Sequence, residues 1–194
     1  MAWLVAGLGN PGERYAKTRH NVGAMVAAVL AEQRSGERFR KVRFMPLDVA
    51  ETHVDDESVY LATSQRYMNE AGPSYASFAK KRDVDADHLI AVHDDIDLAF
   101  GALKVKLGGS SAGHNGLKSL QSALGTAEFL RVRLGVGRPP GRQDPADFVL
   151  DPFARREQAD VRVLIEEAAD AVLSLVREGL VPTQDRYNRG GADN

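Results

Sequence analysis

Polar side chains that could carry out acid–base chemistry occur in four stretches of this sequence, each after an apolar run typical of a β-strand. The stretches contain Asn10 and His20, residues 67–69, residues 93–95, and His114 with Asn115. A histidine can take a proton from water near neutral pH, and a carboxylate can orient its imidazole and make it more basic. Carboxamides add neutral hydrogen-bond donors for a carbonyl or a developing oxyanion.

Other kinds of catalysis find no support in the sequence. It has no cysteine, no serine in a nucleophile elbow, and no metal-binding pattern such as H-E-x-x-H. The chemistry that remains is the attack of water on an acyl carbon, assisted by one base.

Each candidate also has a structural explanation. Asn10 begins an Asn-Pro-Gly turn, Asn69 could start the turn before Gly72, and Asn115 could cap a helix that starts at Gly116. Asp94 could be a solvated loop acid. Together, however, the polar groups follow strands, where the sites of α/β proteins gather, and this favours chemistry.

A dinucleotide site is a further interpretation, because Gly7, Gly9 and Gly12 match G-x-G-x-x-G after a strand-like run. In that fold a helix with apolar periodicity opens within the motif, whereas here no such periodicity begins before Val22. The acid at the expected distance, Glu32, ends a helical run and not a second strand. The pattern therefore disfavours a dinucleotide site.

Length and composition bound the class of protein. The chain has 194 residues, 43% of them hydrophobic, which suits one domain with a sizeable core. The absence of cysteine fits a reducing compartment. No signal-peptide pattern opens the chain, and no apolar run approaches the ~18 residues that span a bilayer. We therefore expect a soluble cytoplasmic protein that does not bind membranes.

Charge is distributed unevenly along the chain, although the net charge is only −2. Residues 101–142 contain seven bases and one acid, whereas residues 143–194 contain eleven acids and six bases. Alternation predicts that Lys104 and Lys106 point outward from one strand, and Arg131 and Arg133 from another. A basic patch on an acidic body is typical of a surface that binds a polyanion, although it could also be a solvated face.

Apolar periodicity and turn residues predict strands that alternate with helices. Strands are expected at residues 2–8, 42–45, 47–52, 59–62, 88–92, 102–107 and 130–136, and helices at 22–31, 73–81, 117–124 and from Asp151-Pro152 to Gly179. The strand-like pieces of residues 42–62 are too close together for helical crossovers. The sequence therefore predicts one α/β domain over residues 1–190, with a twisted mixed sheet flanked by helices and a frayed tail at 191–194.

Five short motifs resemble the bacterial peptidyl-tRNA hydrolase family in order and spacing. They are Gly7-Leu-Gly-Asn-Pro-Gly12, Thr18-Arg-His-Asn21, Tyr67-Met-Asn69 with Gly72, His93-Asp94 with Asp97-Leu98, and Gly113-His-Asn-Gly-Leu-Lys118. The resemblance implies a monomeric, metal-free esterase that needs no cofactor and no obligate protein partner. Such an enzyme cleaves the ester between a peptide, or an N-blocked amino acid, and tRNA, and so recycles tRNA from aborted translation.

The resemblance also implies roles for individual residues. His20 would activate water, Asp94 would hold and polarise His20, and Asn10 would position the substrate and help to reject free aminoacyl-tRNA. The remaining roles fall into two groups: Asn69 and Asn115 would bind the peptide or the scissile carbonyl, with Tyr15, Tyr67 and Met68 lining the cleft, and Lys104, Lys106 and Arg133 would meet tRNA phosphates.

The sequence departs from the family pattern at Ser64, Arg66 and Ala71, and in the loop residues 110–112, where many members have more glycine. Ala112 limits the backbone freedom of that loop. A nucleic-acid-binding module on the same scaffold, without chemistry, is the alternative function. The presence of both His20 and Asp94 disfavours it, because pure binding needs no such pair.

Overall fold

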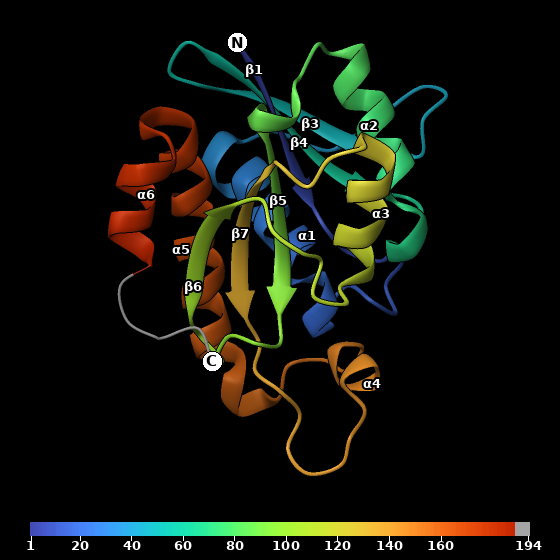
Figure 1. The fold of residues 1–194 in the computed structure, drawn as a ribbon, viewed down its shortest axis with the longest axis vertical. Helices are drawn as coiled ribbons and strands as arrows, with labels where there is room; N and C mark the ends of the chain where they lie inside the picture. Colours follow the sequence, from blue (N-terminus) through green and yellow to red (C-terminus); the bar gives the residue numbers. More distant parts are fainter. Residues whose placement is uncertain (189–194) are drawn as a thin grey trace.

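One mixed sheet of seven strands forms the centre of the computed structural model, which describes residues 1–188 (Figure 1). The spatial order is β2-β3-β4-β1-β5-β7-β6. Strands β4, β1, β5 and β7 run parallel, and the remaining pairs are antiparallel. The strands are β1 (Ala2–Gly7), β2 (Arg40–Lys41), β3 (Leu47–Val54), β4 (Glu57–Ser64), β5 (Leu89–Asp95), β6 (Leu103–Leu107) and β7 (Leu130–Gly135). The predicted mixed sheet is confirmed.

Helices cover both faces of this sheet, with α1 and α5 on one face and α2 and α3 on the other (Figure 1). Helix α6 packs beside β6 at one edge, and the short α4 lies beyond the ends of β5 and β7 (Figure 1). The helices are α1 (Val22–Ala28), α2 (Gly72–Lys81), α3 (Asn115–Leu124), α4 (Pro145–Val149), α5 (Gln158–Glu178) and α6 (Leu180–Tyr187).

Strand alternation explains why the sheet has a core on each face. On β1, the side chain of Val5 packs among the residues of α1 and α5, whereas Leu4 and Ala6 pack among those of α2 and α3. Because β1 is buried on both sides, its sequence is a continuous apolar run and not an alternating one.

Two predicted elements differ from the structure, and one helix of the structure has no counterpart in the prediction. Residues 42–45 form a turn after the two-residue β2, because Val42 N–H bonds to Leu47 and Met45 N–H bonds back to Val42. The last long helix begins at Gln158 and not at Asp151-Pro152, since Pro152 forms a β-bridge with Thr18. Helix α6 follows Gly179 and was not predicted, and the predicted tail 191–194 lies outside the described residues.

Helix α1 crosses the sheet unusually closely, and two glycines make this possible. A Cβ at Gly23 would lie 2.0 Å from the carbonyl oxygen of Val92 on β5, and one at Gly7 would lie 2.7 Å from the Cβ of Ala27. The turn that precedes α1, η1 (Arg19–Asn21), is thereby held against the end of β5. This close approach fixes where His20 stands relative to Asp94.

Gly23→Ala should therefore destabilise the protein, although Gly→Ala inside a helix ordinarily stabilises it by up to about 1 kcal/mol. The added methyl group meets a backbone carbonyl that cannot move aside, and overpacking of this kind costs about 1–3 kcal/mol. Urea unfolding measures the difference, with Val163→Ala on the exposed face of α5 as a control that should be near neutral. An unchanged or raised midpoint for Gly23→Ala would show that α1 can move away from β5.

Candidate active site

A cleft of about 600 Å³ opens where β1, β4 and β5 end. The loop after β1 brings Asn10 and His20 to this cleft, the turn after β4 brings residues 67–69, and β5 brings Asp94. Because β1, β4 and β5 are parallel, their carboxyl ends meet at one edge of the sheet. Residues 110–115 and helix α4 complete the walls.

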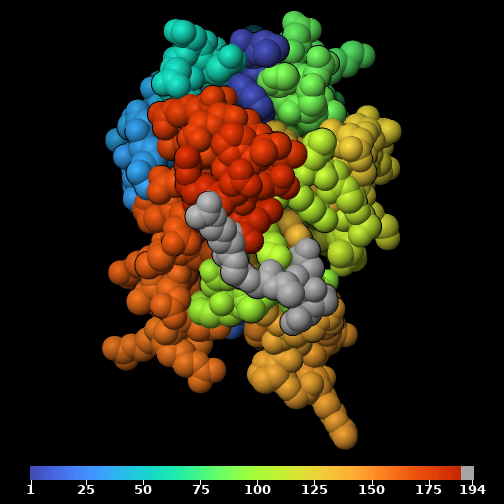
Figure 2. Space-filling view, turned by 60° about the vertical axis from the view of Figure 1, so that its left-hand side comes forward, coloured from blue at the N-terminus to red at the C-terminus, as the bar shows by residue number. Residues whose placement is uncertain are grey.

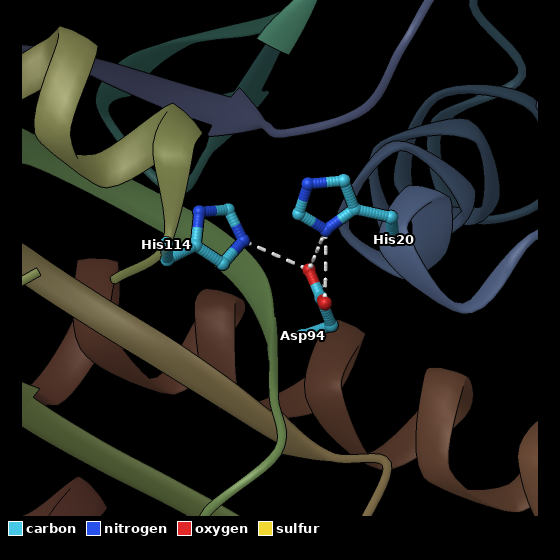
Figure 3. Close-up of side chains that lie close together, drawn as sticks. All are labelled: His20, Asp94 and His114. Carbon is cyan, nitrogen blue, oxygen red and sulfur yellow. Dashed lines mark hydrogen bonds and ion pairs between the residues drawn. The ribbon is translucent and has the colours of Figure 1, made fainter. Parts of the chain in front are cut away.

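The carboxylate of Asp94 lies between two imidazoles at the base of the cleft (Figure 3). Nδ1 of His20 is 3.0 Å from both carboxylate oxygens, and Nε2 of His114 is 2.8 Å from Oδ1. All three side chains are nearly excluded from solvent, with 11% of the His20 side chain, 10% of His114 and 2% of Asp94 exposed. The arrangement is a buried carboxylate that holds two imidazoles.

The hydrogen bonds determine which ring nitrogens carry protons. Nδ1 of His114 accepts the backbone N–H groups of Gly116 and Leu117, at 3.1 and 3.3 Å, so the proton of the neutral ring is on Nε2 and points to Asp94. His20 donates through Nδ1 to the same carboxylate, which leaves its Nε2 as an acceptor. A water molecule in the cleft would meet an oriented base at this nitrogen.

Electrostatics support the same assignment. Burial alone would lower the pKa of His20, but the charge of Asp94 and its hydrogen bond outweigh burial and raise the pKa above 6.5. Burial would raise the pKa of Asp94, but His20 and His114 outweigh it and hold that pKa well below the usual range. His93, whose Nδ1 donates to the Asp94 carbonyl oxygen, differs, because burial lowers its pKa to about 3 and it stays neutral.

Asn10 is held rigidly at the rim of the cleft. Its Oδ1 accepts the backbone N–H of Met68 at 2.7 Å, and its own backbone exchanges two hydrogen bonds with the side chain of Asn21. Since its oxygen is occupied, Asn10 can offer its amide N–H₂ to a ligand in the cleft. The Asn-Pro-Gly sequence is thus a turn that also fixes the direction of a donor.

The other predicted peptide-binding residues lie close by, with one exception. Tyr67, Met68, Asn69 and Asn115 line the cleft, with Tyr67 largely exposed. The sequence predicts Tyr15 as a further lining residue, but Tyr15 is not among the residues that border the cleft. Its ring meets that of Tyr67 edge to face, with the ring centroids 6.1 Å apart, so Tyr15 packs against a residue of the cleft wall.

The basic residues of β6 and β7 divide into two environments. Lys106 and Arg133 line the cleft, and Lys104 lies opposite Arg133 on the adjacent strand. Nε of Arg133 is 2.9 Å from Oδ2 of Asp95, so this cation is partly neutralised. The prediction that Arg131 points outward to solvent is wrong, because it is 1% exposed and its guanidinium bonds to backbone carbonyls of residues 109, 110 and 127.

Asp94, His20 and His114 also present potential metal ligands within 4.8 Å of one another. In the observed bonding, however, Nδ1 of His114 accepts two N–H groups and its Nε2 carries a hydrogen, so the neutral ring has no lone pair left for a cation. The contacts favour a hydrogen-bonded group, and the expectation of a metal-free site stays a prediction. Among residues 1–188, no helix is long and apolar enough to cross a membrane.

Comparison with known proteins identifies the family. A family model described as peptidyl-tRNA hydrolase matches residues 4–194. The peptidyl-tRNA hydrolase of Nocardia farcinica is 51% identical over 185 residues, which cover 95% of each chain. This chain belongs to the peptidyl-tRNA hydrolase family. The peptidyl-tRNA hydrolase of Frankia casuarinae is 50% identical over 186 residues, which cover 96% of this chain and 93% of its own.

Solved structures agree with this membership of the peptidyl-tRNA hydrolase family. The structure of peptidyl-tRNA hydrolase from Acinetobacter baumannii matches with a TM-score of 0.88 at 28% identity, covering 97% of this chain and 95% of that one. Its Arg119Gln mutant matches with a TM-score of 0.90 at 29% identity over the same shares. The predicted fold class and the resemblance are both confirmed, and the chain is an ester hydrolase by family.

Two residues that position the groups of this site were not predicted from the sequence in that role. His114 was proposed as part of a polar stretch, but its contact with Asp94 was not foreseen, and it caps α3 in place of Asn115. Asn21 was recognised only within a motif, yet its side chain fixes Asn10. A histidine directly before a predicted helix start could have indicated the cap, because its ring nitrogen can accept the first free N–H groups.

The balance between burial and charge at His20 can be measured directly. In the wild-type protein the pKa of His20 should lie above that of a free imidazole, and Asp94→Asn should lower it, because burial then acts without an opposing carboxylate. Imidazole NMR titration measures both values, with Asp87→Asn on the exposed turn before β5 as the control. A pKa of His20 that does not respond to Asp94→Asn would contradict the assigned hydrogen bonds.

Proposed function

We propose that this chain hydrolyses the ester bond between tRNA and a peptide or N-blocked amino acid, with His20 as the general base. The observation that supports this most strongly is the bonding of His20, whose Nδ1 is held by Asp94 while the ring lines the cleft. The relatives named above are peptidyl-tRNA hydrolases, and this supports the substrate class.

In this mechanism, Nε2 of His20 takes a proton from water as the water oxygen attacks the ester carbonyl carbon. The resulting imidazolium is stabilised by the carboxylate of Asp94, which stays ionised because its pKa is held low. When the tetrahedral intermediate collapses, the C–O bond to the ribose breaks, and the proton on His20 passes to the leaving ribose oxygen. The products are the peptide carboxylic acid, which then loses its proton to solvent, and tRNA with a free hydroxyl.

Carboxamides provide the groups that contact the scissile bond directly in this proposal. Asn10, Asn69 and Asn115 line the cleft and can donate to a peptide carbonyl or to the developing oxyanion. Neutral donors have an advantage beside a histidine base, because a nearby cation would lower the pKa of that base. The low pKa of His93 keeps this ring neutral, so His93 adds no cation that would lower the pKa of His20.

The tRNA body would meet the basic face formed by Lys104, Lys106 and Arg133. Lys106 and Arg133 lie at the cleft, so phosphates near the ester can approach them without leaving the site. Asp95 already neutralises part of the Arg133 charge. That the protein acts as a cytoplasmic monomer, without a partner, stays a prediction.

His20→Ala should reduce turnover of N-acetylaminoacyl-tRNA by about 10²–10⁴-fold, because loss of a general base typically costs that much. Fold and tRNA affinity should be nearly unchanged, and wild-type turnover should persist in EDTA. Steady-state hydrolysis by purified protein measures the effect, with His53→Ala, an exposed histidine on β3, as the matched control. Near-normal turnover by folded His20→Ala protein would refute the mechanism.

The cleft should also distinguish blocked from free substrates. Free aminoacyl-tRNA carries an α-ammonium group, and the nearby carboxylate of Asp94 is already shared by two imidazoles. Asp95 and Asp97, which also line the cleft, already pair with Arg133 and Arg138, and Asp144 caps α4. Burying the ammonium charge without a dedicated partner is costly, so the N-acetylated form should react at least ~10²-fold faster in kcat/KM.

Asn10→Ala should lower the ratio of kcat/KM between the N-acetylated and the free substrate, because it removes the donor that would bond to the peptide carbonyl. The measurement compares both substrates on the same tRNA, corrected for spontaneous hydrolysis of the ester. A wild-type ratio near one would contradict the selectivity claim, and a ratio that Asn10→Ala leaves unchanged would assign selectivity to other residues.

A further inference from the structure

Arg131 on β7 is an arginine buried beneath the loop of residues 108–113. Its guanidinium donates to the carbonyl oxygens of Ser110, at 2.6 Å, of Gly109, and of Ala127, at 3.3 Å. The guanidinium carbon lies 4.8 Å from the centre of the Phe129 ring. Arg131 borders the cleft, but only 1% of the residue is exposed, so these contacts, and not solvent, surround the charge.

Burying this cation is costly, because no carboxylate within residues 1–188 forms an ion pair with it. Burial lowers the pKa of Arg131, the neighbouring charge of Arg133 lowers it further, and Glu128 offsets only part of the effect. Its Nε also lies buried with no hydrogen-bond partner. The burial of Arg131 therefore destabilises the fold, and its hydrogen bonds to loop carbonyls are the interactions that offset this.

Those contacts restrain a loop with strained backbone. Gly108, Gly109 and Gly113 have positive φ angles, and Ala112, which is not a glycine, has a φ of 48°. A residue with a Cβ in this left-handed region costs roughly 1–2 kcal/mol. Gln121 gives the loop a second, exposed support, since its side-chain amide donates to the Gly109 carbonyl at 2.9 Å.

The restrained loop leads directly into the catalytic group. His114 follows Gly113, reaches Asp94 with Nε2, and caps α3 with Nδ1. Asn115, which lines the cleft, is the next residue. A shift of the loop would therefore move one of the two imidazoles that hold the carboxylate of Asp94.

We propose that Arg131 is a positioning residue, which holds the 108–113 loop so that His114 bonds to Asp94, and that it does not bind tRNA phosphate. This inference rests on the proposed function for its kinetic consequences. Its structural part, the link from Arg131 to His114, is independent of the substrate. It also explains how a loop with Ala112 in a left-handed conformation can keep one geometry.

Arg131→Lys keeps the charge but cannot reach three carbonyls, because an ammonium group lacks the planar fork of guanidinium. It should lower kcat at least about 10-fold on both N-acetylaminoacyl-tRNA and a minimal N-acetylaminoacyl ester without the tRNA body, since small misplacements in a site are expensive. The slope of log affinity against log salt should not change. Ala112→Gly added to Arg131→Lys should recover part of kcat, because it removes the backbone strain.

Lys104→Ala is the matched control, a basic residue on the same sheet face. It should raise KM for the tRNA substrate only and flatten the salt slope by about one unit. NMR adds a readout without substrate: the His114 Nε2 proton, bonded to Asp94, should be protected from exchange in wild-type protein and in Lys104→Ala, but not in Arg131→Lys.

Gln121→Ala tests the same loop if Arg131→Lys does not fold, because Gln121 is a surface residue. It should produce a smaller change in the same direction, in kcat and in His114 proton exchange. The inference is overturned if Arg131→Lys raises KM for the tRNA substrate alone and flattens the salt slope, or if His114 proton exchange stays unchanged. Absence of hydrolysis by the wild-type protein would instead overturn the proposed function and leave the NMR result valid.

Discussion

A single buried carboxylate, shared between two imidazoles, is the interaction on which the site depends. Asp94 lies 74 residues from His20 and 20 residues from His114 in the sequence, yet both rings bond to it within 3.0 Å. An ionised carboxylate without partners would be very costly at this depth, so each ring helps to keep Asp94 charged. That charge in turn gives His20 its orientation and its basicity.

The sheet makes this arrangement possible because its parallel strands end at one edge. Strand β5 supplies Asp94, and α1 is pressed so closely on β5 at Gly23 that the preceding turn delivers His20 to the same place. On the other side of Asp94, the 108–113 loop leads to His114, which caps the start of α3 (Figure 3). The chain around α4, coloured amber, projects at one end of the molecule (Figure 2). Strands β5 and β7 end toward the same end (Figure 1).

Residues of the same type differ in charge state and in contacts according to their surroundings. Arg131 and Arg133 alternate with apolar residues on β7 and lie on the same face, but Arg131 is buried and bonds to loop carbonyls, whereas Arg133 bonds to the carboxylate of Asp95. Likewise, His93 and His20 line one cleft, but burial without a carboxylate contact to its ring keeps His93 neutral, whereas Asp94 raises the pKa of His20. Burial and partners, and not residue type, decide which group can act as a base.

The sequence by itself determined the α/β class, the mixed sheet, the helices over residues 73–81 and 117–124, and the family, because apolar periodicity and short motifs are local properties. It also placed His20 and Asp94 at strand ends. Only the tertiary structure decided that His114 shares Asp94, that Arg131 is buried, and that Tyr15 packs edge to face against Tyr67. Alternation along a strand tells which residues share a face, but not what covers that face. The cover here is a loop from another part of the chain, and its position follows from packing between distant segments.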